Sequence, residues 1–160
     1  MATRAERLEQ IAGGGRADTY SLKLLTPLSL GPVDLMLRLD AAATENEGGA
    51  VVNIQRLGGF RRLSALAENS LLNDSYVLGS MEVFRRLNPS ESIISVPLYV
   101  GALLEAADVR LELFEPSFED QFYSLATYIG TDTALGPFFL GGGVDLDGNY
   151  SLFMHFGRTF

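Results

Sequence analysis

The chain has 160 residues, 47% of them hydrophobic and 20% charged, and its 12 basic and 20 acidic side chains give a net charge of -8. This length predicts one domain, and the acidic balance argues against nucleic acid as a partner, because no basic excess is available to neutralise phosphates. The lack of cysteine excludes disulfides and thiolate metal sites, and a single histidine leaves little for zinc or copper. We therefore expect neither a metal nor another cofactor.

The first 19 residues differ from the rest of the chain. They contain no apolar run of the kind found in signal peptides. Thr3 to Ile11 has helix-forming composition, and three consecutive glycines at 13–15 follow it. We expect residues 1–19 to form a tether or linker and residues 20–160 to form the folded domain. The segment 1–19 is interpreted either as a linker from an upstream domain or as a disordered tail.

From Tyr20 onward, apolar and polar residues alternate at a period of two, which predicts β-strands. Eight strands are expected: from Tyr20 to the breaker at Pro27, and over 33–40, 51–56, 76–85, 96–106, 122–132, 138–144 and 150–160. The connections between them alternate roughly between long and short. Counted back from the C-terminus, the long segments 57–75 and 107–120 fall at the same end, as the outer loops of a membrane barrel do. The pattern predicts an all-β, antiparallel, up-and-down transmembrane barrel of about eight strands.

The alternation has a second interpretation. If the apolar residues faced inward, the same strands would form a soluble, lipocalin-like barrel that binds a small apolar ligand. The strand Val33–Asp40, with three charges on its polar face, by itself favours the soluble interpretation. Three glycines at 141–143 make a poor strand interior unless another part of the chain approaches closely there.

The C-terminal residues resemble a known family. Tyr150 to Phe160 (YSLFMHFGRTF) places Tyr150, Leu152, Met154 and Phe156 on one face, and Phe153 is the one large residue on the other. The run MHFGRTF resembles the closing strand of the surface-antigen barrels of the outer-membrane protein assembly superfamily. The preceding TDTALGPFFLGGG (131–143) is similar to the last hairpin of that barrel at the C-terminus of bacterial patatin-like phospholipases.

The resemblance covers roughly residues 20–160. It implies the outer membrane of a Gram-negative bacterium and a role in membrane anchoring and protein assembly or translocation, of the chain itself or of a fused patatin-like lipase. It also implies outer-membrane lipid and the barrel assembly machinery as partners, with Phe156, Gly157 and Phe160 as an insertion signal. Because that family closes sixteen strands, a homodimer or missing N-terminal strands or a missing domain would have to supply the remainder.

A loop motif belongs to the same resemblance. The segment LGGFRRLS (57–64) is similar to the inward-folded sixth loop of the family, whose hallmark is Arg-Gly-Phe or Arg-Gly-Tyr. Here Gly58 replaces the arginine, and the motif expected to face the lumen is Gly59, Phe60, Arg61 and Arg62. The alternation places four charged residues inward: Arg38, Glu82, Glu105 and Asp132. Inward acids need cationic partners, so we expect Arg61 or Arg62 to reach one of these carboxylates. The alternative is a surface connection with solvated arginines.

No pattern predicts an enzyme. The chain has no Gly-x-Ser-x-Gly nucleophile motif. Asp147-Gly148 is a hairpin signal, and the spacing of Asp145, Asp147 and Asn149 does not fit a calcium loop. His155 has no nucleophile in a recognisable motif nearby, and we expect it to be a hydrogen-bonding residue of the lumen.

Overall fold

The computed structural model describes residues 2–12, 15–47, 54–88, 96–112, 118–133 and 135–157. Their regular elements are ten strands: β1 (Ala2–Ala12), β2 (Gly15–Leu30), β3 (Val33–Glu47), β4 (Gln55–Leu57), β5 (Leu71–Asn73), β6 (Ser75–Arg86), β7 (Leu98–Leu111), β8 (Phe118–Thr133), β9 (Gly136–Asp145) and β10 (Tyr150–Phe156). Eight strands form one antiparallel sheet in the order β1-β2-β3-β6-β7-β8-β9-β10, and β4 pairs with β5. The fold is therefore all-β and up-and-down, as expected.

Within the described ranges, no helix has the length and apolar character needed to cross a membrane.

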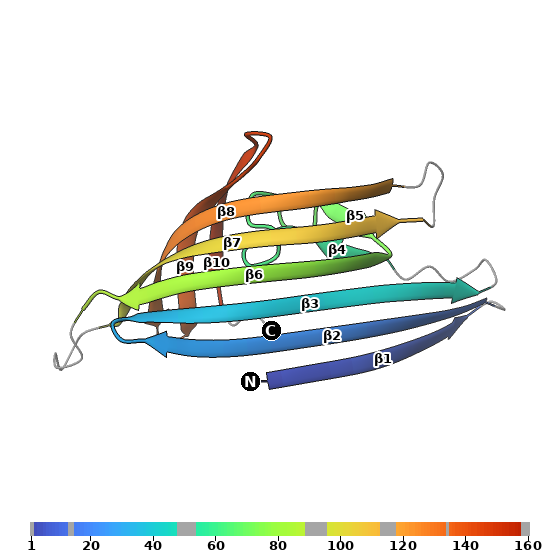
Figure 1. Cartoon of the computed structure of the whole chain (residues 1–160), viewed down its shortest axis with the longest axis horizontal. Helices are drawn as coiled ribbons and strands as arrows, with labels where there is room; N and C mark the ends of the chain where they lie inside the picture. The colour runs from blue at the N-terminus through green and yellow to red at the C-terminus, as the bar shows by residue number, and fades with distance from the viewer. Residues whose placement is uncertain are drawn as a thin grey trace.

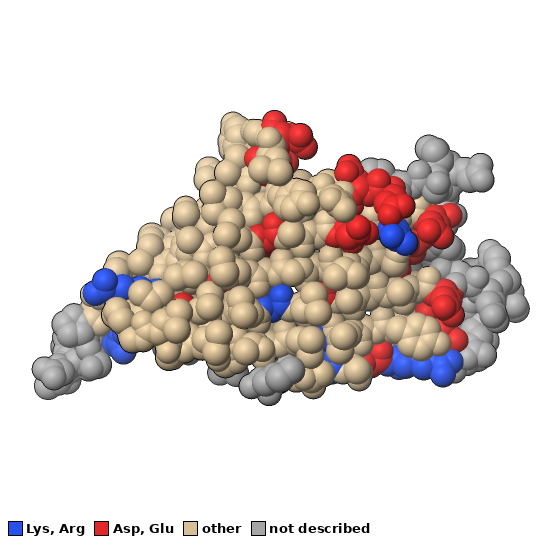
Figure 2. All heavy atoms as spheres, viewed as in Figure 1, with Lys and Arg blue, Asp and Glu red and all other residues tan. Residues whose placement is uncertain are grey.

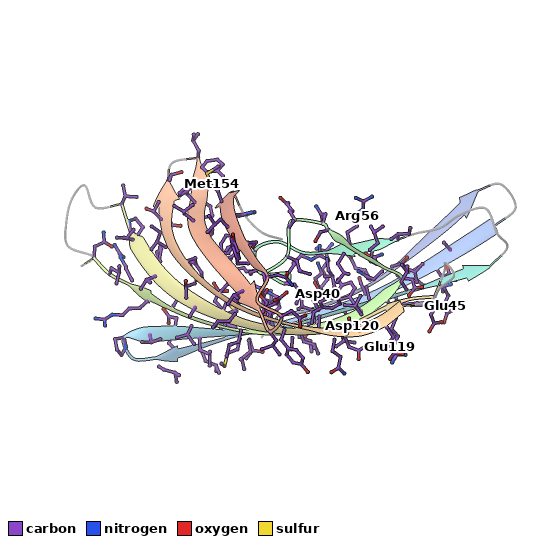
Figure 3. All side chains as sticks on the ribbon, turned by 90° about the horizontal axis from the view of Figure 1, so that it is seen from above. Asp40, Glu45, Arg56, Glu119, Asp120 and Met154 are labelled. Atoms are coloured by element: carbon purple, nitrogen blue, oxygen red, sulfur yellow. The ribbon has the colours of Figure 1, made fainter. Side chains whose placement is uncertain are left out.

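The eight-stranded sheet is strongly curved and open. β1 and β10 are its two edges, and the described residues of these strands do not pair with each other. Figure 1 shows β1 to β8 running across the view, while β9 and β10 turn behind them. Seen from above, the sheet forms a trough, and the segment that carries Arg56 crosses its concave side (Figure 3).

Successive residues of each strand point to opposite faces of the sheet. In β7, for example, Gly101, Leu103 and Glu105 are buried on the concave face, whereas Ala102 and Leu104 are exposed on the convex face. Large apolar side chains are exposed on the convex face of most strands: Leu22, Leu37, Val77, Met81, Val83, Leu98, Val100, Leu104, Tyr123, Leu125, Ile129, Leu140, Val144, Leu152 and Met154. Figure 2 shows this face, with charged side chains gathered mainly toward the ends of the strands.

The core lies between the concave face and the segment 54–74. One cluster joins Leu57 and Leu63 of this segment to side chains of the sheet such as Leu78 and Val109. A second cluster surrounds Phe60. A single curved sheet thus buries its inner face against its own connection rather than against a second sheet or a layer of helices.

Two segments differ from what the sequence suggests. Thr3 to Ile11 has helix-forming composition but is part of a strand, because β1 pairs with β2 from Ala2 opposite Leu25 to Ala12 opposite Gly15. Helix propensity is a weak prior that pairing with a neighbouring strand overrides. Of the strand expected over 51–56, residues 51–53 lie outside the described ranges, and Gln55 and Arg56 belong to β4, which pairs with β5 rather than with the large sheet. Among the described residues the large sheet nevertheless has eight strands, because β1 is one of them.

The ends of two other strands also differ from the expectation. β7 continues to Leu111 and β8 begins at Phe118, so most of the segment expected as an exposed loop over 108–120 is paired strand. The connections β3–β6 and β7–β8 nevertheless lie at the same end of the sheet, as expected, because all neighbouring strands are antiparallel. Whether a further domain precedes residue 20 in the intact protein stays a prediction.

Candidate functional site

Residues 58–70 form a compact loop, here called the inner loop, that lies on the concave face. Its backbone folds on itself through hydrogen bonds from Gly58 N to the Arg62 carbonyl (2.7 Å) and from Gly59 N to the Leu66 carbonyl (3.1 Å). Gly58 and Gly59 have φ of 112° and 96°, and Arg61 and Leu63 also have positive φ, 65° and 71°. Non-glycine residues in this conformation cost on the order of 1 kcal/mol or more each. The contacts with the sheet must therefore offset this strain.

Side chains of the sheet bind the backbone of the inner loop. The two carboxylate oxygens of Glu105 on β7 accept hydrogen bonds from Leu63 N (3.0 Å) and Ser64 N (2.6 Å). The hydroxyl of Ser124 on β8 accepts one from Ala65 N (2.9 Å), and the hydroxyl of Ser151 on β10 donates one to the Ser64 carbonyl (2.5 Å). Three strands thus bind three consecutive residues, which fixes the height of the loop above the sheet.

The expected contact between the loop and a carboxylate is present. Arg61 Nη2 lies 2.5 Å from Glu82 Oε1 on β6, and Arg61 Nε donates to the same oxygen at 3.2 Å. The Tyr128 hydroxyl on β8 donates a third hydrogen bond to that oxygen at 2.5 Å. Glu82 is 2% exposed, so this ion pair is largely removed from water. A charge-assisted pair of this kind is among the stronger contacts that a loop can make with a sheet.

Phe60 places an aromatic ring in the second cluster. It stacks on Phe153 of β10 (centroids 4.8 Å apart) and meets Tyr128 edge-on (5.3 Å). The Arg61 guanidinium lies over the rings of Phe60 and Phe139, 4.8 and 4.9 Å from their centroids. Phe153, the exception in the alternation of the last strand, is therefore large because it packs against the inner loop.

Glycines of the sheet make room for the loop and the rings. A Cβ at Gly143 would lie 2.6 Å from the carbonyl carbon of Ser64, and one at Gly141 would lie 2.7 Å from the ring of Phe153. The close approach expected at the three glycines is therefore present at two of them. Gly101 and Gly130 likewise lie against the rings of Tyr128 and Phe139. Glycine beside an aromatic residue of the neighbouring strand is a known device in curved sheets.

The remaining cations of the concave face lie beside the inner loop. Arg62 donates to the Tyr76 hydroxyl (3.4 Å), which in turn donates to Asp40 Oδ1 (3.1 Å). Lys23 Nζ on β2 lies 3.7 Å from Asp40 Oδ2. Arg38 is on the same face of β3, as expected. Figure 3 shows Asp40 within the trough, whereas Glu45 and Glu119 lie toward the opposite end of the molecule from Met154.

Asp132 and His155 differ from the expectation in the contacts that they make. Asp132 is exposed near the end of β8, where it accepts a hydrogen bond from the Tyr99 hydroxyl (3.0 Å) rather than contacting the loop. His155 points inward as expected, but its Nε2 is buried without a hydrogen-bond partner among the described residues, and its ring packs beside Phe60 (5.9 Å). The hydrogen-bonding role expected for this nitrogen is therefore not seen.

The residues of the expected insertion signal lie at or beyond the end of β10. Phe156 is exposed on the convex face, and Gly157 donates a backbone hydrogen bond to the Pro137 carbonyl (2.8 Å). Phe160 lies outside the described residues. The structure thus describes only the first part of this signal.

Asp145 and Asn149 close the last hairpin, with Asn149 N donating to Asp145 Oδ1 (2.8 Å). No group of three or more His, Cys, Asp or Glu side chains in the described ranges is arranged to hold a metal ion.

Sequence reasoning missed the residues that bind the loop backbone, Ser124 and Ser151, and the hydroxyl of Tyr128. Their positions on the inward face were predictable from the alternation, but no sequence signal gives the partners: a backbone N–H for Ser124, a backbone carbonyl for Ser151 and the Glu82 carboxylate for Tyr128.

In comparisons with family models, curated proteins and solved structures, no match to this chain was found.

Proposed function

We propose that this chain is a membrane-spanning β-sheet domain of a bacterial outer-membrane barrel of the surface-antigen type. The observation that carries the proposal is the distribution of side chains over the two faces. Large apolar residues are exposed along the convex face, and charged residues lie on the concave face against the inner loop. A barrel in lipid has this arrangement, with an apolar outside and a polar interior.

The same observation bears on the soluble alternative. A lipocalin-like barrel would keep its apolar side chains inside, around a ligand, and its charges outside. Here Glu82, Glu105 and Asp40 are buried on the concave face. On the convex face of β7, the residues from Val100 to Ala106 include no charged side chain. This arrangement favours the membrane assignment.

Cysteine labelling tests the assignment, because the chain has no cysteine of its own. The chain is expressed with an export signal, and single variants carry cysteine at Leu104 or Leu125 on the convex face, or at Asp147 in the last hairpin. We expect all three proteins in the detergent-extracted outer membrane, with Asp147→Cys alone labelled by a membrane-impermeant maleimide. A chain in the soluble fraction, with all three positions labelled, would contradict the proposal.

We further propose that the barrel contains more than eight strands. An eight-stranded barrel has room for little more than its own inward side chains. Here a whole segment, 54–74, lies on the concave side, with Leu57 and Leu63 almost completely buried. Additional strands joined to β1 and β10, from a second copy of the chain or from strands of a longer protein, would give this segment the space it occupies.

Edge cysteines distinguish these sources. Ala5 on β1 and Leu152 on β10 both lie on the convex face, and the double variant Ala5→Cys, Leu152→Cys is oxidised in the membrane. A disulfide-linked dimer indicates a second copy. A protein without a cross-link indicates that other strands cover the edges. A disulfide within one chain would contradict the proposal, because it would show that eight strands close on themselves.

The biological role proposed for this domain is membrane anchoring and the assembly or translocation of protein, of itself or of a fused patatin-like lipase. The inner loop supports this role, since it combines a Gly-Phe motif with an arginine–carboxylate contact on the sheet. The test is a folded reporter joined upstream of residue 1 and followed by protease digestion of intact cells. We expect digestion of the reporter, and full protection of a membrane-inserted protein would contradict translocation.

A further inference from the structure

A small enclosed space separates the inner loop from strands β2 and β3. It has a volume of about 110 Å³ and is lined by Lys23, Leu25, Arg38, Asp40, Phe60, Arg61 and Arg62. Four of these seven residues carry a positive charge and one carries a negative charge. The cavity borders the contacts of Phe60 and Arg61, but the sheet residues that line it all belong to β2 and β3 rather than to β6, β7 or β8.

The nearby carboxylates are already engaged. Glu82 Oε1 accepts from Arg61 and Tyr128, and Glu105 accepts from two backbone N–H groups of the inner loop. Asp40 accepts from the Tyr76 hydroxyl and faces Lys23. The four cations around the cavity thus exceed these three carboxylates by one positive charge.

Two guanidinium groups keep donors that the described residues do not satisfy. Among the described residues, Arg38 forms no close ion pair; Glu82, Glu105 and Asp40 attract its charge from farther away, and Arg61 repels it. Arg62 uses Nη2 for the Tyr76 hydroxyl, but its Nε is buried and has no acceptor there. A buried donor without a partner costs about 1–3 kcal/mol, and more when it is charged. An acceptor of negative charge placed in the cavity would satisfy both groups.

We propose that this cavity binds one small free oxyanion, held mainly by the guanidinium groups of Arg38 and Arg62. Planar guanidinium groups match the oxygen spacing of phosphate, sulfate and carboxylate, and bind them with two parallel hydrogen bonds. The bound anion joins the inner loop to β2 and β3. Glu82 and Glu105 join the same loop to β6 and β7. This inference rests on the charges of the cavity and does not depend on the membrane role proposed above.

Inorganic phosphate is the probe for the first experiment. The purified full chain, in the detergent or buffer that keeps it folded and at constant ionic strength, is titrated with phosphate and followed by calorimetry and by its thermal unfolding midpoint. We expect saturable binding of one phosphate per chain. Arg38→Gln and Arg62→Gln should each weaken the affinity at least tenfold, whereas Arg85→Gln, which removes an exposed charge near the end of β6, should change it less than twofold. Equal binding by the three variants, or no saturable binding by the unmodified chain, would overturn the proposal.

A variant that should strengthen phosphate binding keeps the test decisive if an arginine variant does not fold. Asp40→Asn removes the negative charge that lines the cavity and repels an anion. We expect it to bind phosphate at least threefold more tightly than the unmodified chain, although it loses the contact with Lys23. If phosphate only stabilised the fold non-specifically, Asp40→Asn would bind equally or more weakly, and that result would refute the anion site.

Discussion

At the scale of single residues, Arg61 is the residue that joins the inner loop to the sheet by charge. The resemblance proposed from the sequence predicts the arginine of this contact at Gly58, three positions earlier in the chain. The positive φ of Arg61 and the two glycines before it turn the chain so that its guanidinium reaches Glu82. The same turn places it over Phe60 and Phe139. In this chain the contact with the wall is therefore made by Arg61, and not from the position of Gly58.

Glu82→Gln tests the importance of this ion pair. The amide keeps the size of the side chain and can still accept from Tyr128, but it leaves Arg61 without its counter-charge. We expect a loss of about 2–3 kcal/mol in the free energy of unfolding, less than the 3–5 kcal/mol typical of fully buried pairs because Arg61 stays partly exposed. Chemical denaturation measures the loss. Asp132→Asn, an exposed carboxylate on the same sheet, should cost less than about 0.5 kcal/mol, and similar losses for the two variants would contradict a special role for Glu82.

Gly143→Ala tests the close approach of the loop to β9. Its Cβ would lie 2.6 Å from the carbonyl carbon of Ser64, so the backbone of the loop would have to move. We expect a loss of about 1–3 kcal/mol, the usual cost of overpacking, and faster proteolysis after Arg61 or Arg62. Gly79→Ala is the matched control, because a Cβ at Gly79 meets nothing within 4 Å. If both variants unfold at the same denaturant concentration, the loop is not held against β9 as described.

At the scale of elements, β10 combines two roles on its two faces. Its inward residues Ser151 and Phe153 contact the inner loop. Its outward residues are among the most exposed of the chain, with Leu152 86% and Met154 73% exposed. An edge strand with such a face needs a partner or lipid to cover it. One face of β10 therefore packs against the inner loop, and its other face is open to a partner or to lipid.

Deletion of Phe160 tests the insertion signal at the end of this strand. If the terminal aromatic residue directs the strand to the assembly machinery, as the resemblance implies, the deletion should lower the yield of membrane-inserted protein in cells several-fold. Refolding of the purified chain in detergent should change little, because detergent refolding needs no machinery. Inserted yield by cell fractionation and refolded yield by electrophoretic mobility measure the two effects. Equal losses in both would indicate that Phe160 acts through stability alone.

At the scale of the whole molecule, the apolar convex face predicts how added charge will act. Leu125 lies near the middle of β8 on this face, and Leu146 lies in the last hairpin. In a membrane, Leu125→Arg should cost about 2–4 kcal/mol and Leu146→Arg about 0–1 kcal/mol, since the cost depends on depth in the bilayer. Unfolding from lipid vesicles in urea measures this difference. In a soluble protein both leucines already face water, so near-equal stability of the two variants would contradict the membrane assignment.

Much of the architecture follows from the alternation of the sequence. The period of two identified which residues of β6, β7 and β8 face the loop. The inward acids predicted a contact from Arg61 or Arg62 to one of three carboxylates, and the structure has it between Arg61 and Glu82. Alternation determines the face on which a side chain lies because successive residues of any strand point in opposite directions. It does not determine which strands become neighbours.

Pairing partners were decided only in the tertiary structure. β1 has a helix-forming composition and belongs to the sheet because β2 offers it a complete edge, whereas Gln55 and Arg56 of the segment expected as a strand over 51–56 pair with β5 instead. The hydrogen bonds that Glu105, Ser124 and Ser151 make with the loop could not be foreseen either. Their partners are backbone N–H and carbonyl groups, which every residue carries, so only the path of the folded chain selects which of them meet the sheet.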